Sequence, residues 1–207
     1  MANQIILEKV EVSGMEYRDY LEMTSEELKN TDPEVLTPEE KESYETKKLN
    51  MHRMTRIDKS YTPGEDIVNE VSKIEERQIW MVITENWCGD SAQNLPYLAK
   101  IASLNEKIEF KIILRDSNLE IMDMYLTNGA RSIPKLVVFD EEGNELFQWG
   151  ARPRAAQQLV TDLKAQGFDK KYFIEKLHLW YAKDRGVEIE SEILNLIKKS
   201  NLVKNSI

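Results

Sequence analysis

The sequence predicts an α/β fold in which helices cover a mixed β-sheet. Three observations support this prediction. A continuous apolar run ends at Thr84, as expected of a central strand that is covered on both faces. A second strand is indicated over 107–114, where apolar and polar residues alternate, and a third apolar run is followed by a glycine-containing turn and a returning strand. Segments in which apolar residues recur at helical spacing lie around these strands.

Residues 1–64 are predicted to form a mainly helical extension. Residues 1–12 predict a short strand or an ordered arm. Ser13-Gly14-Met15-Glu16 has the spacing of a capping box and predicts the start of a first helix. Thr37-Pro38-Glu39-Glu40 is a stronger start signal, because it combines a capping hydroxyl, a proline suited to the first turn and a glutamate that can reach back to the cap. The helix that begins there is expected to end near Asp58.

The net negative charge of the chain comes entirely from its first part. Residues 1–76 hold 10 Lys and Arg against 19 Asp and Glu, whereas residues 77–207 hold 18 of each. Nucleic-acid binding requires a basic surface, so this balance argues against it. The acidic residues are best interpreted as a solvated helical face, and a docking surface for a basic partner is the alternative.

The central part of the chain is predicted to alternate helices and strands. Apolar residues repeat at helical spacing over 65–76, which indicates a short amphipathic helix. The apolar strand Ile79–Thr84 follows. A helix is expected from Ser91 to about residue 104, with Pro96 inside it as a kink. The alternating strand 107–114 comes next.

A short helix and a hairpin are predicted to complete this part of the chain. The helix is expected over 118–127 and is ended by Asn128-Gly129. Lys135–Phe139 and Glu145–Trp149 are expected to be antiparallel strands, joined by a turn that contains a glycine. A further helix follows and is closed by Gly167.

Residues 168–207 are predicted to form two more helices. Each has a stripe of apolar residues that requires a cover. Either the rest of the chain or a second subunit can supply it, so a homodimer is one expectation. The sequence has no apolar run of about 18 residues, so no membrane span is expected. It also lacks a secretory signal pattern and has a single cysteine, which together favour a cytoplasmic location.

The single cysteine, Cys88, stands where an apolar strand ends and a helix begins. The backbone N–H groups and the dipole at the start of a helix favour a thiolate there. The alternative is that Cys88 is a small buried apolar residue, which is the commoner role of a free cysteine.

Four features of the sequence, in order, resemble the thioredoxin superfamily. Trp87-Cys88-Gly89-Asp90-Ser91 stands at the strand-to-helix junction where that family has Trp-Cys-Gly-Pro-Cys. Pro96 follows Cys88 by eight residues, as the family's helix-kinking proline does. Ile133-Pro134 precedes an apolar strand and a hairpin and resembles the family's cis-proline segment. Asp116 falls where an aspartate at a strand end is common.

The resemblance covers residues 65–167. It implies a thioredoxin-like three-layer sandwich with a mixed central sheet, extended by helices over 1–64 and 168–207. In the family the cis-proline loop presents backbone groups to a bound peptide, which places Ile133 and Pro134 beside Cys88.

The sequence departs from the family's pattern in three places. Ser91 replaces the second cysteine, so an internal disulfide cannot form. Asp90 replaces the motif's proline, and its carboxylate is expected to oppose formation of a thiolate at Cys88. Val82 stands where the family has a buried acid that relays protons, and Ile112 stands at the matching lysine position.

The resemblance predicts monothiol thiol–disulfide exchange, with Cys88 as nucleophile. Ser91, one helical turn further on, can donate a hydrogen bond to the Cys88 sulfur, and the alternative is that Ser91 and Asp90 only cap the helix. The expected partners are protein disulfides or thiols, or a small thiol such as glutathione. The residues expected to bind substrate are Trp87, Gly89, Asp90, Ile133 and Pro134. The competing hypothesis is a non-catalytic thioredoxin-fold module that recognises a protein partner. A third is another thiol-dependent activity, such as glutathione transfer or peroxide sensing.

Other residue types give weaker predictions. Arg115 and Arg131 can favour the thiolate or bind the carboxylates of glutathione, although solvated loop charges are the simpler interpretation. His52 and His178 are far apart in sequence, and no His/Cys cluster has the spacing of metal ligands. No glycine loop that could hold a phosphate is present. We therefore expect no metal and no cofactor, and neither a nucleic acid nor a membrane as a partner.

Overall fold

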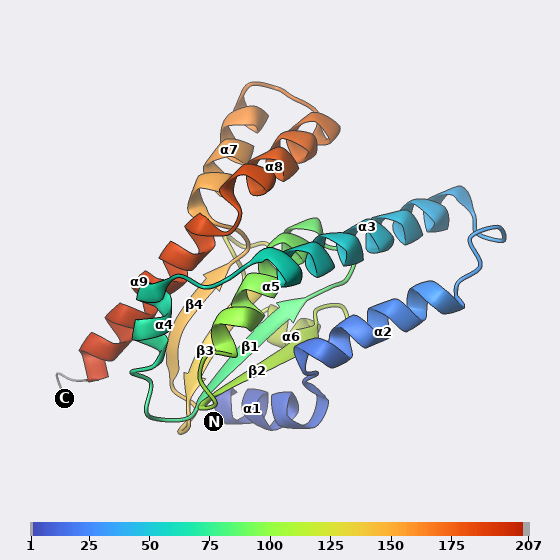
Figure 1. The fold of residues 1–207 in the computed structure, drawn as a ribbon. Helices are drawn as coiled ribbons and strands as arrows, with labels where there is room; N and C mark the ends of the chain where they lie inside the picture. Colours follow the sequence, from blue (N-terminus) through green and yellow to red (C-terminus); the bar gives the residue numbers. More distant parts are fainter. Residues whose placement is uncertain (1, 205–207) are drawn as a thin grey trace.

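The computed structural model describes the backbone of residues 2–204 and the side chains of residues 5–202. The fold is α/β, as predicted (Figure 1). In chain order the described elements are α1 (Ala2–Ser13), α2 (Tyr17–Asn30), α3 (Pro38–Ser60), α4 (Glu65–Val71), β1 (Gln78–Thr84), α5 (Gly89–Ala102), β2 (Ile108–Leu114), α6 (Leu119–Met122), β3 (Lys135–Asp140), β4 (Glu145–Gly150), α7 (Arg154–Ala165), α8 (Lys170–Asp184) and α9 (Val187–Lys204).

The four strands form one mixed sheet in the order β2-β1-β3-β4. β1 pairs in parallel with β2 and antiparallel with β3, and β3 and β4 form an antiparallel hairpin. All seven residues of β1 are buried, which confirms the prediction of a central strand covered on both faces. In this register Val82 lies opposite Ile112 on one side and Leu136 on the other.

The two faces of the sheet bury separate apolar clusters. Alternate residues of β1 point to opposite faces, so Trp80 and Val82 belong to one cluster and Met81 to the other. Helices α3, α4, α5 and α9 cover the first face. Helices α1 and α6 cover the second, and Cys88 lies in that second cluster. The sheet is therefore the middle layer of a three-layer sandwich.

The prediction of a strand or ordered arm at residues 1–12 is wrong, because this segment forms helix α1. Ile6 and Val10 are one helical turn apart, and both are buried against the second face of the sheet. The predicted start of the next helix at Ser13 is also wrong. Met15 pairs with Ile112 in an isolated antiparallel bridge, so the chain is extended there and α2 begins only at Tyr17.

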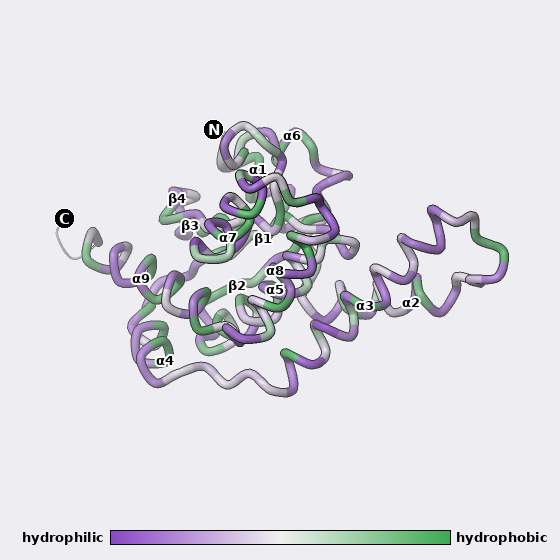
Figure 2. Tube along the Cα trace, turned by 90° about the horizontal axis from the view of Figure 1, so that it is seen from above, coloured by the Kyte–Doolittle hydropathy of each residue, from purple (hydrophilic) through white to green (hydrophobic). Residues whose placement is uncertain are grey.

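The capping box predicted at Thr37 is confirmed. The Glu40 backbone N–H donates to Thr37 Oγ1 at 3.4 Å, and the Glu40 carboxylate accepts from the Thr37 backbone N–H at 2.9 Å. Helix α3 starts there and runs to Ser60. Helices α2 and α3 lie side by side and extend together beyond the rest of the molecule (Figures 1 and 2).

The helix predicted over 118–127 is much shorter, since α6 ends at Met122. Asn128 and Gly129 both have positive φ values, of 51° and 76°, and Thr127 pairs with Ala130 across them. Asn-Gly with positive φ at both residues is a two-residue hairpin turn, not the end of a helix. The residues between α6 and this turn are not helical, and Tyr125 among them is buried on the second face of the sheet.

The two helices predicted after residue 168 are confirmed as α8 and α9. The apolar stripe of α9, formed by Ile189, Ile193 and Ile197, packs into the first cluster, so the same chain supplies its cover. Among the described residues, no helix is long and apolar enough to cross a membrane. The division of the chain at residues 64 and 167 stays a prediction, as does a homodimer.

Candidate functional site

Cys88 is the residue at which the loop after β1 turns into helix α5. It is the N-cap of that helix, with φ −79° and ψ 117°, and its sulfur accepts a hydrogen bond from the Ser91 backbone N–H at 3.5 Å. A Ser, Thr or Asp oxygen usually takes this position. The Cys88 thiol also donates to the carbonyl oxygen of Ile133, at 3.4 Å from Sγ. The structure thus brings the cysteine and the Ile133-Pro134 segment together.

Three loops meet around this thiol. The first is the Cys88 turn, and the second contains Ile133-Pro134, whose peptide bond is cis. The third is the turn that begins at Gly150, the last residue of β4, where a Cβ would lie only 2.2 Å from the carbonyl oxygen of Pro134. Gly150 has φ +131°, which L-residues with a side chain rarely adopt. The third loop therefore lies directly against the second, and this packing requires glycine.

The Cys88 side chain is held in an environment that favours the neutral thiol. Cys88 is 9% exposed. Burial raises the pKa of its thiol, and the nearby carboxylate of Asp90 raises the pKa further. Hydrogen bonding by Ser91 and by the backbone of Asp90 acts in the opposite direction but does not outweigh burial. The helix start alone therefore does not produce a thiolate here.

Ser91 lies one turn into α5 and is 1% exposed. Its backbone N–H is used by the Cys88 sulfur. Its hydroxyl lies near enough to lower the pKa of the Cys88 thiol, yet it has no hydrogen-bond partner of ordinary geometry among the described residues. A buried hydroxyl without a partner is uncommon. Ser91 is thus an unused donor beside the thiol.

Asp90 is held by side chains that come from distant parts of the sequence. Arg152, in the loop after β4, donates from Nε to Asp90 Oδ2 at 3.1 Å and also contacts that oxygen through Nη2. Tyr181 of α8 donates its hydroxyl to Asp90 Oδ1 at 2.7 Å, and Asn94 of α5 donates to the Tyr181 oxygen at 3.0 Å. We call Asp90, Asn94, Arg152 and Tyr181 the Asp90 clamp. Of these four residues, only Asp90 could be singled out from the sequence.

Helix α8 also places His178 over the start of α5. A Cβ on Gly89 would lie 3.1 Å from His178 Cε1 and 3.7 Å from Arg53 Nη1. His178 Nδ1 lies 3.4 Å from Gln93 Nε2. Burial lowers the pKa of His178 to about 4; the positive charge of Arg53 also lowers it, and Asp90 opposes this. His178 is therefore neutral at physiological pH and lies against the cysteine motif.

Trp87 and the two loop arginines lie toward solvent. Trp87 is 37% exposed, and the Arg115 guanidinium stacks over its ring at 4.7 Å from the ring centroid. Arg115 pairs with Asp116, while Arg131 makes two hydrogen bonds to Asp123, at 2.6 and 2.8 Å. Each arginine is thus paired with a neighbouring acid, Arg131 in an exposed position and Arg115 half-buried against the Trp87 ring.

Comparison with known proteins decides the family. A family model described as thioredoxin matches residues 37–164, which is more than half of the chain. The chain belongs to the thioredoxin family. The matched segment of this thioredoxin-family protein begins at α3 and contains the Cys88 turn, the cis-proline segment and the Gly150 turn.

Two solved structures resemble the thioredoxin-family protein in fold. One is a protein of unknown function, PA1234, from Pseudomonas aeruginosa, with 22% identity, a TM-score of 0.56, and coverage of 73% of this chain and 86% of that one. The other is an HIV epitope scaffold, with 23% identity, a TM-score of 0.55 and the same two coverages. At these identities the likeness shows the fold alone. No curated protein matches the chain.

The residues at the two positions that the resemblance assigns to the family's proton relay are both apolar. Val82 and Ile112 are partners in the parallel β1–β2 register, and both are fully buried in the first apolar cluster. A different buried acid, Glu85, was not predicted from the sequence. It is 8% exposed and accepts from the Asp116 backbone N–H at 2.8 Å, and burial raises its pKa. Glu85 follows the end of β1, three residues before Cys88.

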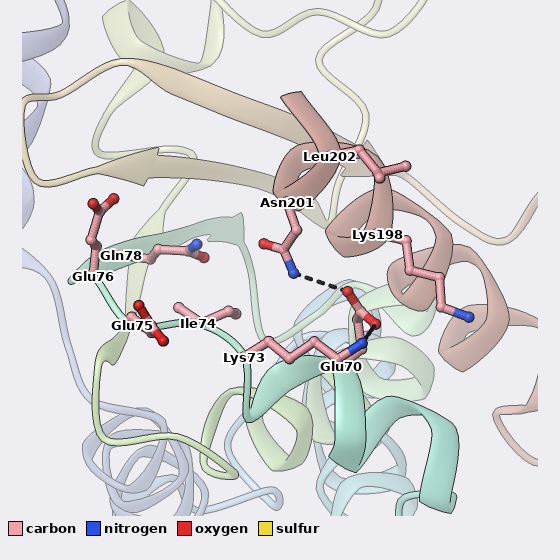
Figure 3. A pocket seen from close by; sticks show the side chains of 9 residues that line it. All are labelled: Glu70, Lys73, Ile74, Glu75, Glu76, Gln78, Lys198, Asn201 and Leu202. Carbon is pink, nitrogen blue, oxygen red and sulfur yellow. Dashed lines mark hydrogen bonds and ion pairs between the residues drawn. The ribbon is translucent and has the colours of Figure 1, made fainter. Parts of the chain in front are cut away.

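A pocket of about 530 Å³ lies elsewhere in this thioredoxin-family protein, between α4 and α9 (Figure 3). Its buried carboxylate, Glu70, accepts from Lys73 at 2.7 Å and from Asn201 at 3.0 Å. The bond from Asn201 joins the two helices. In the described part of the chain, no group of three or more His, Cys, Asp or Glu residues could hold a metal ion.

Asp90→Asn is expected to lower the pKa of the Cys88 thiol, because it removes the negative charge that opposes the thiolate. The thiolate fraction at neutral pH then rises, and alkylation of Cys88 by iodoacetamide becomes severalfold faster. The measurement is the alkylation rate as a function of pH, whose midpoint should move down. Asp116→Asn is the matched control, because that acid is not among the groups that shift the thiol. An unchanged midpoint in Asp90→Asn would contradict this prediction.

Proposed function

We propose that this thioredoxin-family protein carries out thiol–disulfide exchange by a monothiol route, with Cys88 as the nucleophile. The observation that supports this best is the position of the Cys88 sulfur. It lies between the first turn of α5, where Ser91 N–H reaches it at 3.5 Å, and the carbonyl oxygen of Ile133 at 3.4 Å. A thiolate formed there is stabilised by the helix start and lies beside a segment able to bind an extended peptide.

The exchange takes place in two steps. The Cys88 thiol first loses its proton to solvent, and the thiolate attacks one sulfur of a substrate disulfide. A bond forms between Cys88 and that sulfur, the substrate S–S bond breaks, and the second substrate sulfur leaves as a thiolate and takes up a proton. A small thiol such as glutathione, as its thiolate, then attacks the substrate sulfur of the mixed disulfide: a bond forms between these two sulfurs, the bond to Cys88 breaks, and Cys88 leaves as a thiolate. One disulfide is broken and one is formed, so no further oxidant or reductant is needed.

The residues around Cys88 fit this route. Ser91 replaces a resolving cysteine and can donate its unused hydroxyl hydrogen to the sulfur once the thiolate forms. The carbonyl of Ile133 accepts from the thiol in the resting state, so deprotonation of Cys88 frees it for an incoming peptide. Trp87, Gly89, Asp90 and Pro134 surround these groups and are the proposed substrate contacts.

The second candidate function is a non-catalytic module that recognises a protein partner. The raised pKa of the buried Cys88 thiol favours it, as does the apolar Val82–Ile112 pair at the relay position. In that case Cys88 is a packing residue of the second apolar cluster, and binding uses the surface around Trp87.

The test is the reduction of a glutathionylated peptide by glutathione, with and without the protein. Wild type is expected to accelerate the reaction and to show a mixed disulfide on its single cysteine by intact-mass spectrometry. Cys88→Ser should do neither, while its circular dichroism and melting temperature match those of wild type. Equal rates for the two proteins would overturn the exchange reaction. If the same cellular proteins also co-purify with both, the binding module is the function.

A further inference from the structure

We propose that the α7–α8 hairpin is a hinged cover over the Cys88 site and that the Asp90 clamp is its latch. This inference rests on the proposed function, since a covered thiol must be uncovered before it can meet a disulfide. It assigns regulation of that site to residues 154–184, of which 165–184 lie outside the matched family segment.

The hairpin has an apolar core of its own. Ala156 and Val160 of α7 pack against Leu177 and Tyr181 of α8 in a cluster that is separate from both clusters of the sheet. The main packing partner of α8 is α7. In Figure 1 the two helices stand away from the sheet as a pair. They are therefore a unit that can move without disturbing the main core.

Both ends of this unit are joined to the body at residues that are themselves held firmly. Gly150, just before α7, lies against Pro134, and Gly186, just after α8, lies against the ring of Tyr97. Gly150, Arg185 and Gly186 have φ values of +131°, +55° and +88°. A hinge is a short segment between fixed points that absorbs changes in φ and ψ. The two connections meet this description.

The contacts that hold α8 over the site are mainly polar. Tyr181 donates to Asp90 at 2.7 Å, and His178 lies 3.4 Å from Gln93. Beside Tyr181 a cavity of about 850 Å³ separates the α8–α9 turn from α3, with Arg56, Ser60 and Tyr97 among its other lining residues. When polar contacts beside a cavity break, water can take the place of the lost hydrogen-bond partners. Separation of such contacts therefore costs less free energy than separation of an apolar interface of the same area.

In the closed position α8 covers the start of α5, whereas the Cys88 side chain itself is buried in the second apolar cluster. His178 lies on Gly89, next to Cys88, and Tyr181 fixes Asp90 at the following residue. When α8 moves away, Asp90 keeps Arg152 as its partner in the loop after β4 but loses the Tyr181 hydroxyl. The start of α5, directly beside Cys88, then becomes accessible from that side.

Tyr181→Phe in the full chain tests the cover by removing only the latching hydroxyl. The readout is the rate of iodoacetamide alkylation of Cys88 across a range of pH. Its midpoint reports the thiol pKa, and its high-pH plateau reports access to the thiol. We expect the plateau to rise about tenfold, as for loss of one hydrogen bond to a charged group that holds the closed state. Hydrogen exchange should also become faster in α8 and in the first turn of α5, but not in α9.

Tyr172→Phe is the matched control, because Tyr172 lies on the same helix, is 37% exposed and makes no hydroxyl hydrogen bond within the described residues. An unchanged plateau in Tyr181→Phe would overturn the cover, and so would an equal rise in both variants. Alkylation does not require exchange activity. A raised plateau in Tyr181→Phe without reduction of the glutathionylated peptide by wild type therefore rejects the exchange function and supports the cover. Reduction of the peptide by wild type with an unchanged plateau in Tyr181→Phe supports the exchange function and rejects the cover.

Discussion

Gly150→Ala is expected to lower the free energy of unfolding by about 3 kcal/mol, since it combines backbone strain at positive φ with a steric clash. A Cβ at this position would lie 2.2 Å from the carbonyl oxygen of Pro134 and 3.2 Å from Cα of Lys135. Both are backbone atoms of the cis-proline segment and the start of β3, so neither can rotate away as a side chain would. The third loop must then separate from the second.

The measurement is denaturant unfolding followed by circular dichroism. Gly167→Ala is the matched control, since Gly167 also has a positive φ, +83°, but a Cβ added there would meet no atom within 4 Å beyond its chain neighbours. That variant should lose only about 1 kcal/mol, the cost of left-handed backbone for a residue with a Cβ. Equal losses in the two variants would show that the Gly150 contact with Pro134 has no energetic effect.

Trp80→Ala is expected to lower the free energy of unfolding by about 3–5 kcal/mol, the usual range for removal of a buried large aromatic side chain. Trp80 is fully buried in the centre of β1. Its indole N–H donates to Gln78 at 3.0 Å, and its ring packs edge-on against Phe147 at 5.9 Å between centroids. The substitution leaves a cavity in the first apolar cluster that its neighbours cannot fill.

Trp87→Ala is the control of the same residue type, at 37% exposure and seven residues further along. It should cost about 1 kcal/mol or less, mainly the cation–π contact with Arg115. The check is the melting temperature together with the denaturant midpoint for both variants. A Trp80→Ala protein as stable as Trp87→Ala would show that the first cluster repacks freely.

Much of the fold could be predicted because its signals are local. The apolar run of β1 and the capping box at Thr37 each depend on a few consecutive residues, and both hold in the structure. Residues 1–12 are ambiguous, because the apolar set that includes Ile6 and Val10 is short enough to fit a strand or a helix. The segment is a helix because this conformation places Ile6 and Val10 together against the second face of the sheet. Asn128-Gly129 is ambiguous in another way, since a hairpin turn and a helix stop share this composition.

The residues of the candidate site also fall into those that the sequence could predict and those that it could not. The motif around Cys88 and the Ile133-Pro134 segment could be recognised by their resemblance to a family. Arg152, His178 and Tyr181 could not, because no local pattern marks them and they reach the site only through the positions of the β4–α7 loop and of α8. His178 and Tyr181 belong to α8, which lies outside the matched family segment. Only tertiary packing brings α8 next to the Cys88 motif.

The apolar Val82–Ile112 pair has a consequence for how such a sequence can change over evolutionary time. An acid at position 82 alone, or a lysine at position 112 alone, would place an isolated charge in a fully buried apolar cluster. That costs several kcal/mol, a large share of the roughly 5–15 kcal/mol by which domains are stable. Either single substitution would therefore remove a large part of the free energy of unfolding. A proton relay at this place therefore requires the two substitutions to compensate one another, because each buried charge needs the other as its partner.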